Sequence, residues 1–136
     1  MRLLSFFCLL FPSLLFSQTP NWSSKIDPQM LDFIQNPDTA VEFLVIMQAQ
    51  ADISAVKDIR KKEDKGRFLL QTLSAFAENT QRNVRDLLHN ADVPNQSFWV
   101  TNALWVKGNR ALIEQIAQLP EVGRLEINPV WHLNLP

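Results

Sequence analysis

The side chains that most often carry out chemistry are scarce in this chain. It contains one cysteine, Cys8, and two histidines, His89 and His132. A structural zinc site needs four cysteine or histidine ligands and a disulfide framework needs paired cysteines, so neither is expected. The three glycines are far apart, which excludes a glycine-rich loop that cradles phosphate groups. We expect no metal ion and no cofactor.

A hydrolytic site is equally hard to assemble from these residues. Nucleophilic catalysis needs a nucleophile, a base beside it and an acid that orients the base. His89 falls near the end of a predicted helix, where it suits a capping or helix-dipole role, and His132 falls in an extended tail. Neither is flanked by a nucleophile motif. The sequence therefore predicts that these 136 residues are not an enzyme.

Length and charge limit the remaining classes of function. The 136 residues, 46% of them hydrophobic, suffice for one domain with a core. The 13 basic and 14 acidic residues give a formal net charge of −1. Because nucleic-acid and membrane-surface binders use an excess of positive charge, neither partner is expected. Trp99 and Trp105 resemble base-stacking platforms, but the segment around them is not basic.

The first 17 residues have the layout of a secretory signal peptide. A short basic start is followed by an almost wholly apolar segment, 3–16, and then by small or polar residues. The apolar segment is too short for a comfortable membrane span, and Pro12 interrupts it. We expect cleavage near the Ser17–Gln18 bond, so that the mature chain is secreted or periplasmic. An uncleaved anchor is the alternative.

Hydrophobic spacing predicts the elements of the first half. Residues 18–40 carry three prolines and read as a linker, with one short helical turn at 28–35. The continuous apolar run 41–47 predicts a central strand. Residues 51–64 are polar with alternating charge signs, which fits a solvated helix face or loop, or else a docking patch for an acidic partner. Apolar residues at helical spacing predict one long amphipathic helix over 62–90.

The second half reads as a hairpin followed by a helix. Two short apolar runs, 97–101 and 103–107, are separated by Asn102 and predict paired strands. Asn109 is a candidate N-cap, because its side chain can accept a hydrogen bond from the first turn of a helix. The helix that follows it is expected to stop at Pro120.

A last strand at 122–127 completes the order strand–helix–strand–strand–helix–strand. This order predicts an α+β domain over 41–128 with the ferredoxin-like split βαβ arrangement (βαββαβ), a four-stranded antiparallel sheet with both helices on one face. The final residues, 129–136, form an extended tail. The other sheet face would be uncovered, and its apolar side chains, Trp99 and Trp105 among them, make it a candidate partner surface.

Several segments of the mature chain follow the pattern of a known family. The closing pattern, Leu119-Pro120-Glu121-Val122 followed by Leu125-Glu126, is the most specific of them. On these segments, the chain from residue 41 onward resembles the propeptide (inhibitor) domain of subtilisin-like serine proteases. The segments that carry the resemblance are 43–47, 51–54, 62–67, 98–104 and 113–126.

The resemblance implies a way of acting on a partner protease. In the family, the helix-free sheet face packs on two surface helices of the protease. The C-terminal tail then enters the active-site cleft like a cleaved product and adds a strand beside the substrate-binding strands. The implied function is that of an intramolecular chaperone and temporary active-site inhibitor. The implied partner is a subtilisin-like serine protease, in cis or in trans.

The resemblance also assigns roles to residues. Trp99 and Trp105 would contribute to the sheet face, and Leu133 or Asn134 lies nearest the processing bond. Glu126 and Asn128 match the acidic close of the motif, which faces positive helix N-termini of the protease. An ordinary exposed strand residue is the alternative reading of Glu126. The implied protease-binding tail is Pro129, Val130, Trp131, His132, Leu133 and Asn134.

Three interpretations stay open at the level of sequence. We expect a protease precursor whose catalytic domain does not follow Pro136 in this chain, with 129–136 as the start of a linker to it. A stand-alone secreted inhibitor of subtilisin-like proteases would carry the same surface. The third interpretation is a secreted ferredoxin-like interaction module unrelated to proteases, which would use its aromatic face to bind a different protein or ligand.

Overall fold

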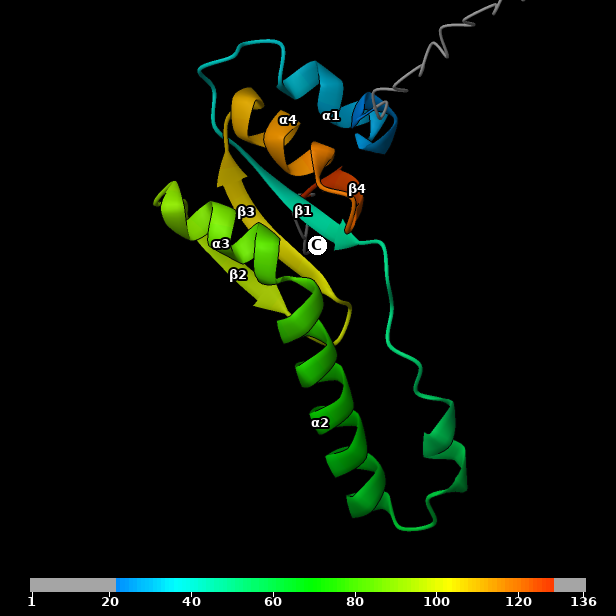
Figure 1. Ribbon diagram of the computed structural model, residues 1–136. Helices are drawn as coiled ribbons and strands as arrows, with labels where there is room; N and C mark the ends of the chain where they lie inside the picture. Colours follow the sequence, from blue (N-terminus) through cyan, green and yellow to red (C-terminus); the bar gives the residue numbers. More distant parts are fainter. Residues whose placement is uncertain (1–21, 129–136) are drawn as a thin grey trace, which may run out of the picture.

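Strand β1, Val41–Met47, forms from the continuous apolar run and lies inside a four-stranded antiparallel sheet (Figure 1). The computed structural model describes residues 22–128. The strand order across the sheet is β2-β3-β1-β4. The predicted α+β class and the antiparallel four-stranded sheet are confirmed. The other strands are β2 (Asn95–Phe98), β3 (Ala103–Gly108) and β4 (Val122–Ile127).

Four α-helices and two short 3-10 segments connect the strands within the described part of the chain. The side chain of Asn109 accepts a hydrogen bond from the backbone N–H of Leu112 at 3.2 Å, which confirms the predicted N-cap of α4. The helices are α1 (Pro28–Phe33), α2 (Lys62–Thr80), α3 (Arg82–Asn90) and α4 (Arg110–Gln118), and the 3-10 segments are η1 (Trp22–Lys25) and η2 (Ser54–Asp58).

The core lies between one face of the sheet and the helices α3 and α4 (Figure 1). Along β1, alternate side chains such as Phe43 and Val45 are fully buried, because successive residues of a strand point to opposite faces. Their antiparallel partners on β3, Val106 and Leu104, are buried on the same face. The helices complete the core with apolar side chains, which include Val84, Leu88, Ile113 and Ile116.

The helix predicted over 62–90 is in fact two helices, α2 and α3, which meet at Gln81. Gln81 is completely buried and its side chain bonds to the β2–β3 hairpin, which fixes the chain direction at this point. Helix α2 projects beyond the sheet (Figure 1), and Ala77 is its buried residue. Apolar spacing continues through both helices, so periodicity alone does not reveal the junction.

The hairpin pairs over a different range from the one predicted. Strand β2 ends at Phe98, and the residues predicted to extend it, 99–101, form a turn with Asn102. Asn102 has a positive φ of 45°, a left-handed conformation that asparagine tolerates better than most residues and that ends the ladder. Trp99 is therefore a turn residue and does not belong to the sheet.

The part of the expected linker that the structure describes packs against the domain. Ile26, Met30 and Ile34 are buried in the core. Ile26 forms a parallel bridge with Leu125, and the backbone N–H of Asp27 donates to the Leu125 carbonyl at 2.9 Å. Residues 22–34 thus cover the outer edge of β4. The scattered apolar side chains were too few for a periodicity argument to place them.

The expected signal peptide, 1–17, and the tail, 129–136, lie outside the described residues. Within residues 22–128, no helix has the length and apolar character needed to cross a membrane.

Candidate interaction face

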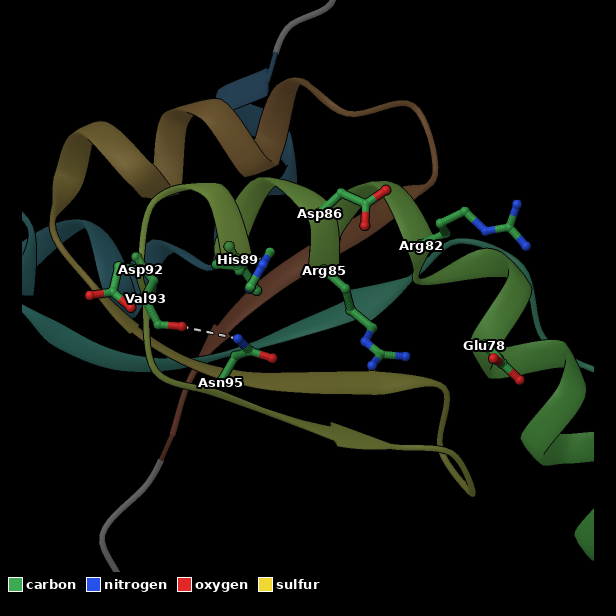
Figure 2. Close-up of a pocket in the computed structure, with 9 residues that line it drawn as sticks. Glu78, Arg82, Arg85, Asp86, His89, Asp92, Val93 and Asn95 are labelled. Atoms are coloured by element: carbon green, nitrogen blue, oxygen red, sulfur yellow. Dashed lines mark hydrogen bonds between the residues drawn. The ribbon is translucent and has the colours of Figure 1, made fainter.

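The sheet face opposite the helices presents an apolar strip, which we call the open face. It is built by cross-strand neighbours: Leu44 lies opposite Trp105, and Ile46 lies opposite Ala103, across β1 and β3. Phe98 of β2 lies opposite Ala103 on the same face. Leu44, Ile46 and Trp105 are half-buried although their neighbours along the strands are fully buried. Figure 2 views the sheet from its edge, with the helices on one side of it.

Charged side chains border one end of this strip. Trp105 donates its indole N–H to a carboxylate oxygen of Glu42 at 3.3 Å, and Lys107 Nζ lies 3.8 Å from the other oxygen. Glu42 and Lys107 are register partners across β1 and β3. Because all three side chains are on the solvent side, these contacts orient the indole ring more than they stabilise the fold.

A second charged pair borders the strip on β4. Arg124 Nε and Glu126 Oε1 are 2.6 Å apart, and the two residues lie opposite Ile46 and Leu44 of β1. The side chain of Glu126 is 34% exposed and that of Arg124 is 63% exposed. The backbone N–H of Asn128 donates to the Glu42 carbonyl at 3.1 Å, which continues the pairing with β1 beyond the end of β4. The open face is therefore an apolar strip with a charged rim.

The structure brings together three of the residues singled out from the sequence. Trp105, Glu126 and Asn128 all lie on or beside the open face. Trp99 is separate, in the hairpin turn, where it is 39% exposed. The tail residues Pro129, Val130, Trp131, His132, Leu133 and Asn134 are outside the described part of the chain.

Sequence reasoning did not name most of the apolar strip. Leu44, Ile46 and Ala103 belong to runs that are apolar on both faces, so alternation could not assign them a side. The signal that could have found them is register: once Leu44 is placed opposite Trp105, every second residue of β1 must share that face.

A shallow polar hollow of about 420 Å³ lies on the other side of the molecule, along α3 and the start of β2 (Figure 2). Its basic side chains come from α3 and are Arg82, Arg85 and His89, and its acidic side chains are Glu78, Asp86 and Asp92. Asn95, also in its wall, donates its side-chain amide to the Val93 carbonyl at 3.0 Å. Because the hollow carries charges of both signs and is open to solvent, its side chains are better suited to contact with water than to selective binding of one ligand. Within residues 22–128, no cluster of three or more His, Cys, Asp or Glu side chains suits a metal ion.

Asp52, in the connector between β1 and α2, has an altered acidity. The backbone N–H and the hydroxyl of Ser54 donate to its two carboxylate oxygens at 2.9 and 3.1 Å, and these bonds lower the pKa of Asp52 below its usual value. A lowered pKa in the folded chain adds stability above the unfolded pKa, and that stability is lost as the pH falls through the folded value. The carboxylate is fully exposed, so this effect is local to the connector.

Comparison with protein-family models, with curated proteins and with solved structures gives no match. The open face is thus interpreted on its own geometry.

Proposed function

We propose that this chain is the propeptide domain of an exported subtilisin-like serine protease. In this role it acts as an intramolecular chaperone during folding of the protease and then as a temporary inhibitor of its active site. The open face binds the surface of the protease, and the C-terminal tail occupies the substrate cleft in the manner of a product.

The arrangement of strands supports this proposal. The order β2-β3-β1-β4, with all neighbours antiparallel, is the order expected of a ferredoxin-like split βαβ domain, in which the two outer strands are the second and the fourth. We propose that the chain has this fold. The same fold is implied by the resemblance of the segments 43–47, 98–104 and 113–126 to subtilisin-like propeptides.

The observation that carries the proposal is the open face itself. A sheet face with half-buried Leu44, Ile46 and Trp105 gains free energy when a partner covers it, at roughly 25 cal/mol per Å² of apolar surface removed from water. The charged rim of Glu42, Lys107 and the Arg124–Glu126 pair suits the polar margin of a protein–protein interface. We propose that Glu126, whose partner in the free chain is Arg124, meets the positive N-terminus of a helix of the protease.

The position of β4 relates the open face to the tail. Glu126 on this strand lies beside the apolar strip, and Asn128 is still hydrogen-bonded to β1. The chain that continues from Asn128 therefore starts at the edge of the proposed interface. From there, 129–136 can pair with an edge strand of the protease as an added β-strand.

The test of the open face is a pair of matched double variants measured as inhibitors of subtilisin. Leu44→Ser with Trp105→Ser removes the centre of the strip and is expected to raise the inhibition constant about hundredfold, or about 2.7 kcal/mol, because central aromatic contacts dominate such interfaces. The control, Leu31→Ser with Phe33→Ser, changes two exposed apolar side chains of α1 (43% and 55% exposed) and should leave inhibition within about twofold.

Melting of both variants, followed by circular dichroism, separates a binding defect from unfolding. Equal inhibition by the open-face variant and the unaltered chain would rule out the open face as the protease contact.

A further inference from the structure

Exposed apolar side chains continue from the open face into the hairpin turn 99–102. Phe98, Trp99 and Val100 follow one another in the sequence and are 37%, 39% and 60% exposed. Phe98 closes β2 and lies on the open face, opposite Ala103. Trp99 and Val100 continue the apolar surface beyond the end of the ladder. We call the segment Phe98–Val100, together with its turn, the hairpin tip.

The hairpin tip is anchored by an asparagine that is almost completely buried. Asn102 is 3% exposed, and its side-chain amide donates to the Ala49 carbonyl at 2.8 Å and to the Thr80 hydroxyl at 3.1 Å. Its own carbonyl accepts the backbone N–H of Met47 at 3.1 Å. One turn residue thus bonds to the end of β1, to the connector after it and to the end of α2.

Gln81 completes this anchor from the α2–α3 junction. Its amide donates to the side-chain oxygen of Asn102 at 3.0 Å, and its carbonyl oxygen accepts the hydroxyl of Ser97 at 2.6 Å. Gln81 is fully buried, so these bonds are shielded from water. Ser97, just before the turn, and Asn102, at its end, are therefore both hydrogen-bonded to the side chain of Gln81.

The hydrogen bonds of Asn102 hold it in a left-handed conformation that costs a non-glycine residue some conformational energy. Here the result is a fixed turn that presents an exposed tryptophan. A turn whose backbone is already held in place loses little conformational entropy on binding, which favours tight contacts.

The geometry points to the hairpin tip as a second contact element for the same protease, with Asn102 as its positioning residue. This inference rests on the proposed function. The occupant is an apolar recess on the protease beside the area that the open face covers, because Phe98 belongs to both surfaces and makes them continuous. The open face would supply general affinity, and Trp99 with Val100 would discriminate among subtilisin-like proteases by the shape of that recess.

The experiment measures inhibition of subtilisin by the unaltered chain and by three variants. Trp99→Ala with Val100→Ala is expected to raise the inhibition constant at least tenfold without changing the melting midpoint, because neither side chain takes part in the buried hydrogen bonds. The matched control, Phe33→Ala, removes an exposed aromatic side chain of α1 and should change inhibition less than twofold.

Asn102→Gly tests the positioning role. Glycine accepts the positive φ but removes the amide that bonds to Ala49 and Thr80. We expect weaker inhibition together with faster hydrogen–deuterium exchange of the peptide that contains 99–102. Because the lost bonds are neutral hydrogen bonds, a higher salt concentration should restore neither the inhibition nor the slow exchange. A variant with faster exchange but unaltered inhibition would overturn the positioning role.

Different results would overturn the role of the hairpin tip and the proposed function. If the Trp99→Ala, Val100→Ala variant inhibits subtilisin as tightly as the unaltered chain, the hairpin tip is not a contact element. The proposed role of the open face would be unaffected by that result. Absence of inhibition by the unaltered chain overturns the proposed function and the hairpin tip together.

Discussion

Two buried polar side chains, Gln81 and Asn102, determine how the hairpin meets the helix layer in the described part of the chain. A buried amide is tolerated when its hydrogen bonds are made and is costly when they are not. The Thr80 hydroxyl donates to the Phe76 carbonyl at 2.9 Å and accepts from Asn102, so the network ends in the backbone of α2. These satisfied polar groups therefore fix the point at which the hairpin meets the helices.

Replacement of Gln81 by leucine should therefore destabilise the chain although it adds apolar character. The Ser97 hydroxyl and the Asn102 side-chain oxygen would each lose a partner. We expect a loss of about 2–3 kcal/mol in the free energy of unfolding, measured by urea denaturation. Gln71→Leu, on the exposed surface of α2, is the control and should stay within about 0.5 kcal/mol. A smaller loss for Gln81→Leu than for its control would contradict the importance of the network.

Residue-scale prediction from the sequence succeeded where the role is local. Asn109 was identified as an N-cap because its capping hydrogen bond joins it to Leu112, only three residues further along the chain. Asn102 was identified from the sequence only as the residue between the two hairpin strands. The buried hydrogen bonds of Gln81 and Asn102 were not predicted, because their partners lie 16 to 53 residues away and nothing in these residue types signals such contacts.

At the scale of elements, the N-terminal segment 22–34 belongs to the packed domain, although the sequence reads as a linker there. Met30 and Ile26 are buried beside β4, and Lys25 Nζ donates to the Leu119 carbonyl at 2.8 Å. The segment adds core and also shields the backbone of β4, an outer strand that would otherwise be open to unwanted pairing. Strand β4, which borders the open face, is therefore packed against a segment that is far away in the sequence.

Met30→Ala tests whether this segment is part of the fold. Because Met30 is completely buried, we expect a loss of about 2–4 kcal/mol in the free energy of unfolding. Leu31→Ala changes the adjacent residue of α1, which is 43% exposed, and should cost less than about 1 kcal/mol. Equal, small effects of the two substitutions in urea denaturation would show that 22–34 acts as a linker after all.

Some element boundaries were predicted from the sequence pattern and others were not. Strands β1 and β4 have the predicted bounds, because an apolar run or an alternation ends abruptly at each side of them. The single long helix over 62–90 and the first hairpin strand over 97–101 were predicted wrongly, because the chain changes direction at Gln81 and at Trp99 for tertiary reasons. The second hairpin strand was predicted to within one residue. The packing of 22–34 depends on a complementary surface that no local pattern describes.

On the scale of the whole molecule, the helices and the N-terminal segment bury one sheet face, and the other face keeps its apolar strip in contact with water. A chain that exposes Leu44, Ile46 and Trp105 in this way is more stable when a partner covers them. The proposed partner is a subtilisin-like protease, which the open face holds while the tail occupies the active site. Sequence order predicted the existence of this face, and register was needed to define its residues.

The most direct measurement compares the whole chain with a chain that ends at Asn128, both as inhibitors of subtilisin, with the products followed by mass spectrometry. If the tail supplies product-like contacts as proposed, we expect inhibition by the whole chain, slow trimming near Leu133–Asn134, and at least about hundredfold weaker inhibition by the shortened chain. Equally tight inhibition without the tail, or rapid degradation of the whole chain without any inhibition, would contradict the proposed function.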